Sequence, residues 1–212
     1  PHMLTKSTGE SIRRLGRWLP VNFINHLRDS GTLRTTVDVL ATLTMPPVLA
    51  LGAPSAVLKF LELSNLCQTM QYGPYPSQII HLYEPEAGKP TRLIVFVHGG
   101  AWGSGLPWMY RLVASPFLKE GWAVAVVGYR TYPDGLVDEQ VEDVETALEY
   151  LLKEHSFERV TLSGHSSGAH IALISCIDQI IRQYLAIDSF LGLSGVYDIS
   201  HHFDYEAGRG VE

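Results

Sequence analysis

The sequence predicts an α/β protein, built on a mostly parallel, doubly wound sheet and preceded by an N-terminal helical cap. Two features of the 212-residue chain lead to this prediction. From Ser77 onward, short apolar runs alternate with segments of helical periodicity, the pattern of parallel strands joined by crossover helices. The apolar runs are nearly unbroken, as expected of strands that are buried on both faces.

The apolar runs set the expected strands. The segment QIIHLYEP, residues 78–85, is expected as a strand that ends at a proline. Four further runs are expected as buried strands: RLIVFVHGG (92–100), WAVAVVGYR (122–130), RVTLSG (159–164) and SFLGLSG (189–195).

Three helices are expected between these strands. The first covers Tyr110 to Lys119 and is followed by a turn at Gly121. The second runs from Val137 to Leu152, where apolar residues recur on one helical face with Asp and Glu opposite. The third, AHIALISCI (169–177), is apolar throughout and is expected inside the domain. Residues 67–212 are therefore predicted to form the α/β domain.

Composition limits the classes of function. The chain is 46% hydrophobic and 18% charged, which fits one globular domain with a sizeable core. Its net charge of −6 gives a nucleic-acid partner no electrostatic support. The two cysteines, Cys67 and Cys176, have no paired spacing, so neither a disulfide framework nor a cysteine-rich metal site is expected.

The first 66 residues differ in character from the rest. Residues 1–3 look like the remainder of a cloning site, and residues 4–66 are predicted to form the helical and apolar cap. The segment from Lys6 to Arg34 contains six basic residues and two acidic ones. This basic amphipathic start fits contact with an anionic membrane surface, a transit-like segment, or a solvated helix on the main domain. No secretory signal peptide is seen, so a cytoplasmic or membrane-associated location is expected.

An uncharged stretch of twenty residues follows at 39–58. Its length would suffice for a membrane span, but Pro46, Pro47 and Pro54 would break the helix that a span requires. A bent apolar cap, or a patch that dips into a membrane, is the favoured interpretation. Peripheral membrane contact is accordingly predicted for residues 4–61.

A serine stands at the centre of the strongest motif. Gly164-His165-Ser166-Ser167-Gly168 matches G-x-S-x-G, after an expected strand and before an expected helix. So sharp a turn strains its central residue, and the serine oxygen stands above the sheet edge at the helix N-terminus. There the backbone N–H of the next residue can face a developing oxyanion. The alternative is a plain glycine-rich loop.

A second glycine motif, HGGAW (98–102), follows the preceding buried strand. The N–H groups of Gly100 and Ala101 can point into the same site, which with Ser167 would give three donors around one oxygen. His98 is expected to brace this loop, and His165 to pack beside the serine turn.

The chain from about Ser77 to Glu212 resembles the α/β-hydrolase superfamily. It is most similar to the hormone-sensitive-lipase-like carboxylesterases and their relatives, the feruloyl-esterase-like proteins, kynurenine formamidases and isoprenylcysteine methylesterases. The matching segments are VHGGAW (97–102), YRTYPDG (129–135), EDV (142–144), LSGHSSGAH (162–170) and LGLSGVYD (191–198). The resemblance implies Ser166 as nucleophile, Gly100, Ala101 and Ser167 as oxyanion donors, and no cofactor or metal.

The expected base and acid are missing from this sequence. Members of this superfamily place an Asp or Glu and then a His after the nucleophile. We expect a segment beyond Glu212 to supply them, so that the C-terminal part of the fold is absent. His201 or His202, near Asp198, is the local alternative, whereas His170 is expected in the core. The remaining histidines, His26, His81 and His155, form no metal spacing.

Aromatic residues suggest what would bind. Trp102, Tyr132 and Tyr197 fall in loops at the expected carboxyl edge of the sheet, and suit a small-molecule ester with an apolar group. The leading hypothesis is a serine carboxylesterase that forms an acyl-enzyme on Ser166. Alternatives are a formamidase or amide hydrolase with the same site, a receptor-like binder similar to the plant gibberellin receptors, or a membrane-anchored interaction protein.

Overall fold

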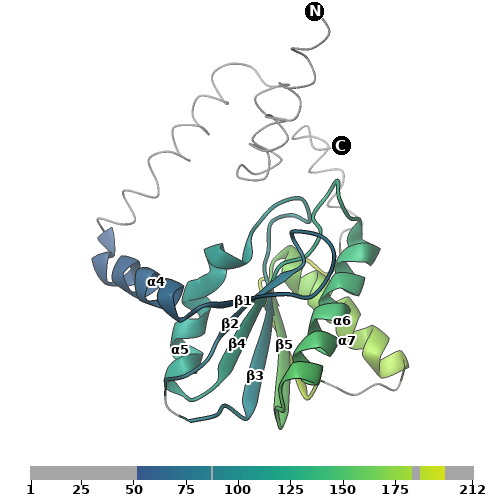
Figure 1. The fold of residues 1–212 in the computed structure, drawn as a ribbon. Helices are drawn as coiled ribbons and strands as arrows, with labels where there is room; N and C mark the ends of the chain where they lie inside the picture. Colours follow the sequence, from purple (N-terminus) through teal and green to yellow (C-terminus); the bar gives the residue numbers. More distant parts are fainter. Residues whose placement is uncertain (1–51, 87, 183–186, 199–212) are drawn as a thin grey trace, which may run out of the picture. The chain divides into compact units, whose positions relative to one another are not determined.

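The computed structural model describes residues 52–86, 88–182 and 187–198 (Figure 1). The chain divides into two units, Pro54–Tyr197 and a second unit of Pro1–Ala53 with Asp198–Glu212. Almost all of the second unit lies outside the described residues. The predictions for residues 4–51, including the membrane contact and most of the cap, therefore stay predictions. In the described ranges no helix is long and apolar enough to cross a membrane.

The unit Pro54–Tyr197 is built on a six-stranded sheet with the order β1-β2-β4-β3-β5-β6. Strands β3, β4, β5 and β6 are parallel, whereas β1 and β2 add two antiparallel pairings at one side. The strands are β1 (Gln68–Gln71), β2 (Ile79–Tyr83), β3 (Arg92–Val97), β4 (Ala123–Val127), β5 (Arg159–His165) and β6 (Ser189–Leu193).

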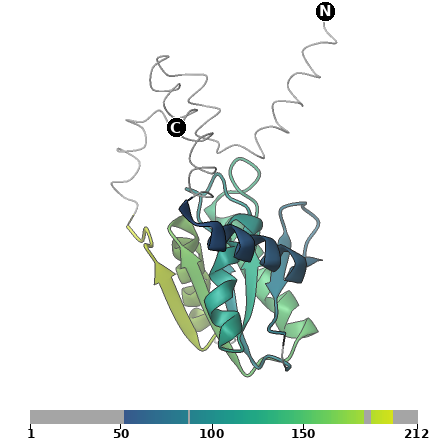
Figure 2. The ribbon, with the colours of Figure 1, turned by 90° about the vertical axis from the view of Figure 1, so that its left-hand side faces the viewer.

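Helices cover both faces of this sheet (Figure 1). One core cluster packs α6 (Val137–Glu154) and α7 (Ser167–Ile181) on one face. The other packs α4 (Pro54–Leu66), the 3₁₀-helix η1 (Pro107–Val113) and α5 (Ala114–Lys119) on the opposite face. Figure 2 shows α4, in dark blue, lying across this second face.

The side chains of each central strand point alternately to the two faces of the sheet, and this explains why the apolar runs of these strands are unbroken. In β3, Leu93, Val95 and Val97 belong to the first cluster. Ile94 and Phe96 point to the second, because successive side chains of a strand alternate between faces. A strand with a helical layer on each side thus needs apolar residues at every position.

The structure corrects the expected elements at two points, the helix at 110–119 and the strand β1. The helix expected at 110–119 begins earlier, as η1 at Pro107, and becomes α-helical only at Ala114. Pro54, one of the three prolines expected to interrupt a helix that spans a membrane, is the first residue of α4, a position where the missing N–H of proline costs no helical hydrogen bond. Strand β1, rich in Gln, was not expected at all.

The fourth strand was expected to be buried, whereas β6 is partly exposed in the part of the chain that the structure describes. Leu191 and Leu193 are 43% and 41% exposed. Among the described residues, β6 pairs with β5 alone (Figure 2).

Candidate active site

Strand register brings the two glycine motifs together. Val97, the last residue of β3, lies beside Gly164 of β5, and Gly164 lies beside Gly192 of β6. Because these strands are parallel, the loops that follow them leave the sheet at the same edge. The HGGAW loop and the serine turn therefore meet there, as predicted.

Ser166 occupies the sharp turn between β5 and α7. Its φ of 52° and ψ of −122° lie outside the regions open to an ordinary L-residue, at a cost of about 1–3 kcal/mol. The turn is held by a hydrogen bond from Ser166 N–H to the carbonyl oxygen of Leu193 on β6, at 2.9 Å. The Ser166 hydroxyl makes no capping bond to α7, although serine at a helix start usually does. The strained serine turn is confirmed.

The two flanking glycines allow three backbones to approach closely. A Cβ on Gly164 would overlap the backbone of Gly168, and a Cβ on Gly168 would overlap the carbonyl groups of Val97 and His98. Any other residue at Gly168 would push α7 away from the end of β3. The glycines thus set the distance between the serine turn and the HGGAW loop.

The HGGAW loop is itself strained and closed by hydrogen bonds. Ala101 and Trp102 have φ values of 50° and 58°, the left-handed region that residues with a Cβ seldom adopt. Gly103 N–H donates to the carbonyl oxygens of Ala101 (2.7 Å) and Gly100 (3.2 Å). The Ser104 hydroxyl donates to the Gly100 carbonyl oxygen at 2.8 Å.

These bonds fix the direction of the Ala101 N–H. In a planar trans peptide the C=O of one residue and the N–H of the next point in opposite directions. The Gly100 carbonyl faces Gly103 and Ser104, so the Ala101 N–H points away from them. Ser167, the first residue of α7, has no acceptor for its own N–H within the helix.

The third expected donor is occupied. Gly100 N–H donates to the Ser167 hydroxyl at 3.1 Å, instead of pointing freely into the site as predicted. The cause is the close approach of the loop to the start of α7. In this structure Gly100 therefore joins the loop to the helix, and its N–H is not available alongside those of Ala101 and Ser167.

His98 lies below the loop, as expected of a bracing residue. Its ring is 1% exposed and stacks on Tyr129, with centroids 4.3 Å apart and planes at 17°. Tyr110 stacks more loosely, at 6.0 Å and 27°. The Tyr129 hydroxyl donates to the His98 carbonyl oxygen at 2.8 Å. Burial lowers the pKa of His98 to about 4, so the ring is neutral at neutral pH.

The other described histidines near the turn are also engaged. His165 Nδ1 lies 3.2 Å from the Tyr110 hydroxyl, so this side chain packs beside the turn as expected. His170 contacts the edge of Trp102, with centroids 5.6 Å apart, and burial lowers its pKa. His201 and His202 lie outside the described residues.

The three aromatic residues expected to bind substrate lie in two places: Trp102 and Tyr132 are neighbours, and Tyr197 lies after β6. Tyr132 N–H donates to the Trp102 carbonyl oxygen at 2.9 Å, which brings these two residues together. The Trp102 side chain is partly buried against the first core cluster, whereas Tyr132 is 48% exposed. Tyr197 belongs to the segment after β6 and covers Gly192. A role of all three in substrate binding stays a prediction.

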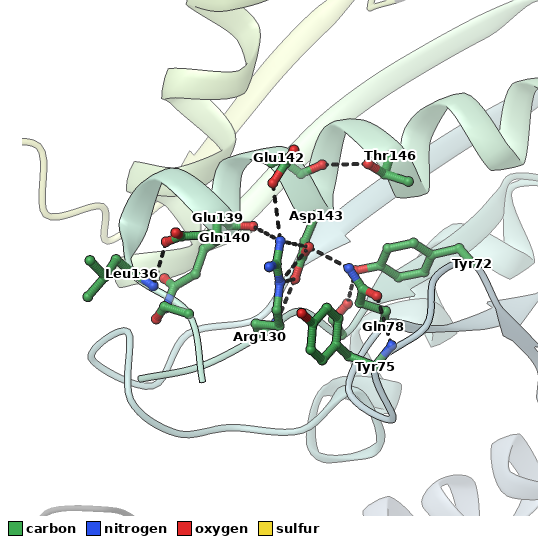
Figure 3. A network of polar contacts seen from close by, with 12 residues as sticks. Tyr72, Tyr75, Gln78, Arg130, Leu136, Glu139, Gln140, Glu142, Asp143 and Thr146 are labelled. Carbon is green, nitrogen blue, oxygen red and sulfur yellow. Dashed lines mark hydrogen bonds and ion pairs between the residues drawn. The ribbon is translucent and has the colours of Figure 1, made fainter. Parts of the chain in front are cut away.

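A buried polar network beside the site was missed (Figure 3). Asp143 on α6 accepts hydrogen bonds from Arg130 Nη2 (2.6 Å), Arg130 N–H (2.8 Å) and Gln78 Nε2 (2.6 Å). The Asp143 hydrogen bonds raise the pKa of Arg130 above its ordinary value. This network fixes the loop after β4, which carries Tyr132. A signal existed in the sequence: Asp143 lies between Val141 and Val144, on the apolar side of its helix.

A second missed residue is Gln140, whose side chain is fully buried. Its Nε2 donates to the Trp102 carbonyl oxygen at 2.8 Å and to that of Gly135 at 3.2 Å. Among the described residues, no group of three or more His, Cys, Asp or Glu side chains could hold a metal ion.

A parallel sheet with helices on both faces, a strained serine between a strand and a helix, and a glycine loop at the neighbouring strand define an α/β-hydrolase. The described geometry and the sequence agree on that class. The chain belongs to the BD-FAE family, whose pattern matches residues 80–192, more than half of the sequence.

Individual relatives agree with this assignment. An isoprenylcysteine alpha-carbonyl methylesterase of Arabidopsis thaliana is 27% identical over 159 residues, 68% of this chain and 37% of that protein. A kynurenine formamidase of Salmo salar is 28% identical over 143 residues, 64% of this chain and 48% of that protein. The chain thus spans less than half the length of these curated relatives.

A solved structure supports the fold. Inhibited esterase B from Lactobacillus rhamnosis matches with a TM-score of 0.57 and 22% identity. The match covers 78% of this chain and 62% of that one. The predicted α/β-hydrolase fold and the resemblance to this group of carboxylesterases are therefore confirmed.

Proposed function

We propose that the protein is a serine hydrolase that cleaves a carboxylic ester through an acyl-enzyme on Ser166. The observation that carries the proposal is the strained turn that presents Ser166 at the sheet edge. Backbone strain of this kind persists only where the surroundings enforce it, and it concentrates at functional sites. Similarity to proteins named methylesterase and esterase adds support.

The proposed reaction uses the described donors. The Ser166 hydroxyl oxygen attacks the ester carbonyl, and the N–H groups of Ala101 and Ser167 bind the resulting oxyanion. Collapse of this intermediate breaks the ester C–O bond, and the leaving oxygen takes the proton that the base removed from Ser166, so that the alcohol departs and an acyl group stays on Ser166. Water then gives a proton to the same base and attacks the acyl group; the bond to the Ser166 oxygen breaks, this oxygen regains the proton, and the acid leaves.

The base that takes the serine proton is the second part of the proposal. Each described histidine near the turn is held by another aromatic ring: His98 by Tyr129, His165 by Tyr110 and His170 by Trp102. We assign the base to a histidine, and its orienting carboxylate to an Asp or Glu, in polypeptide beyond Glu212; His201 or His202, which lie outside the described residues, is the local alternative. Within this proposal, an apolar acyl or alcohol group lies against Trp102, Tyr132 and Tyr197.

Labelling with a fluorophosphonate probe tests the proposal, using the longest natural form of the protein. We expect one labelled serine, loss of labelling in Ser166→Ala, and retention in Ser175→Ala. Ser175 is the control because it is buried on α7, the helix that follows Ser166, and its hydroxyl donates to the Ile171 carbonyl oxygen. Absence of labelling in well-folded protein would exclude the enzyme and favour a receptor-like binder.

A second candidate is an amide-type hydrolase with the same site, favoured by the kynurenine formamidase similarity. Ester and formamide substrates that carry the same p-nitrophenyl ring, released as p-nitrophenol from the ester and as p-nitroaniline from the formamide, distinguish the two. A higher kcat/KM for a p-nitrophenyl ester than for p-nitroformanilide is expected of both chemistries, because the ester is intrinsically more reactive. The kcat/KM of each substrate must therefore be divided by the rate constant of its uncatalysed hydrolysis. A larger quotient for the formamide than for the ester would favour the second candidate.

A further inference from the structure

The Trp102 carbonyl is the point where three parts of the chain meet. It accepts hydrogen bonds from Tyr132 N–H, at 2.9 Å, and from Gln140 Nε2, at 2.8 Å. Tyr132 follows β4, whereas Gln140 lies in the first turns of α6. The loop that carries the proposed oxyanion donor is thus tied to two elements that are distant from it in sequence.

This loop needs such ties. Ala101 and Trp102 are consecutive residues with a Cβ, and both have positive φ. Each tends to return to the right-handed or extended region unless its neighbours hold it. Rotation there would turn the Gly100–Ala101 peptide and with it the Ala101 N–H.

Gln140 is well placed to prevent this rotation. Its side chain is completely buried, and its amide donates to two carbonyl oxygens, those of Trp102 and Gly135. Turning the amide round would place its oxygen against both carbonyls, so its orientation is determined. The start of α6 is fixed in turn by Asp143, one turn further on, through its bonds to Arg130 and Gln78.

We infer that Gln140 is a positioning residue that holds the Ala101 N–H toward the oxyanion. The path is short. Gln140 holds the Trp102 carbonyl, which belongs to the same peptide group as the Gly103 N–H. This N–H bonds back to the carbonyl oxygens of Gly100 and Ala101, and the resulting turn fixes the direction of the Ala101 N–H. This inference rests on the proposed function. It adds that an α6 side chain, distant from Ser166 in sequence, sets the rate of its reaction.

The first test replaces Gln140 by methionine, which keeps the volume and removes the donor. Active sites are counted by complete fluorophosphonate labelling, and kcat is expressed per labelled serine. Loss of a whole oxyanion donor lowers kcat about 100- to 1000-fold. Because Tyr132 still holds the Trp102 carbonyl, we expect about a tenfold loss in kcat per labelled site, with KM within about twofold.

Gln179→Met is the matched control. Gln179 is also a buried glutamine, at 6% exposure, but it lies near the end of α7, twelve residues after Ser167, the first residue of that helix. That separation is about 18 Å along a helix. We expect kcat per labelled site to stay unchanged in this variant, even if its melting temperature falls as much as that of Gln140→Met.

Gln140→Glu provides an independent readout. An ionised carboxylate cannot donate to the Trp102 carbonyl, whereas a protonated one can. Burial between two carbonyl oxygens raises the pKa of such a carboxyl. The kcat of this variant relative to wild type should therefore increase as the pH is lowered from about 8 to about 5.5, while the same ratio for Gln140→Met stays flat.

The outcomes are separable. If wild-type protein labels at Ser166 and Gln140→Met keeps its kcat per site, the positioning role is wrong and the proposed function stands. An equal loss in Gln179→Met, or a flat pH ratio in Gln140→Glu, overturns the role as well, because both indicate a general structural effect. If wild-type protein does not label, the proposed function fails and the inference falls with it.

Discussion

Replacement of Asp143 by alanine tests whether its buried bonds to Arg130 and Gln78 stabilise the fold at the end of the sheet where β4 finishes (Figure 3). The Asp143 side chain is 1% exposed and that of its partner Arg130 is 13% exposed. Truncation leaves the guanidinium without its main partner and the Gln78 amide without its acceptor. Removing one member of a buried ion pair costs about 3–5 kcal/mol, chiefly through the charge left behind.

A neighbouring carboxylate offers the matched control. Glu142 bonds to the same Arg130 at 3.3 Å, but its side chain is 71% exposed. Exposed ion pairs contribute about 0–1 kcal/mol, so Glu142→Ala should lower the unfolding free energy by less than about 1 kcal/mol. The two adjacent substitutions each remove one carboxylate bonded to Arg130, and they differ in the burial of that carboxylate and in the further hydrogen bonds that Asp143 accepts from Gln78 and the Arg130 backbone.

Urea unfolding followed by circular dichroism gives the free energies, and thermal melts give a second measure. At about 2–4 °C per kcal/mol for a domain of this size, Asp143→Ala should melt about 10 °C lower. A double-mutant cycle with Arg130→Ala should return a coupling above about 1 kcal/mol. Equal losses in the two carboxylate variants, or coupling near zero, would refute the reasoning.

Three further predictions concern the loop and the turn. Ser167→Ala removes the acceptor of Gly100 N–H and should lower the free energy of unfolding in urea by about 1 kcal/mol. Labelling of Ser166 should persist, because the backbone N–H of residue 167 remains. Loss of labelling would assign the Ser167 hydroxyl a direct role. Gly168→Val forces side-chain atoms against two carbonyl groups, so we expect a loss of about 3 kcal/mol or insoluble protein on expression, and wild-type stability would contradict the close packing. The pKa of His98 is about 4 in the folded protein and about 6.5 when unfolded, so the unfolded chain binds the extra proton between these values. Stability should therefore fall by up to about 3 kcal/mol as the pH drops through this window; His98→Phe should flatten the dependence, and an unchanged slope would show that other groups cause it.

The elements with local signals could be predicted from the sequence. Strands β3, β4 and β5 carry unbroken apolar runs because helices cover both their faces. The serine turn and the HGGAW loop could be predicted because glycine is required where backbones approach, as at Gly168. Each signal lies within a few consecutive residues.

The parts that escaped prediction depend on contacts between distant residues. Arg130 and Asp143 are 13 positions apart, and Gln140 and Trp102 are 38 apart. An acidic or amide side chain on a helix usually faces solvent, so its type alone does not indicate burial. The Gly100 bond to the Ser167 hydroxyl spans 67 positions and depends on how closely the loop approaches α7. Such contacts follow only from the assembled sheet.

The distribution of strained backbone gives an independent reason to locate the function at this edge. In the described part of the chain, the non-glycine residues with positive φ are Ala101, Trp102, Ser166 and Ser194. All four follow the parallel strands β3, β5 and β6 at their carboxyl ends, where open α/β sheets bind ligands. A fold selected for stability alone would gain by relaxing these positions. Strain kept at one edge, and held there by Gln140 and the Leu193 carbonyl, is therefore best explained by the chemistry proposed for Ser166.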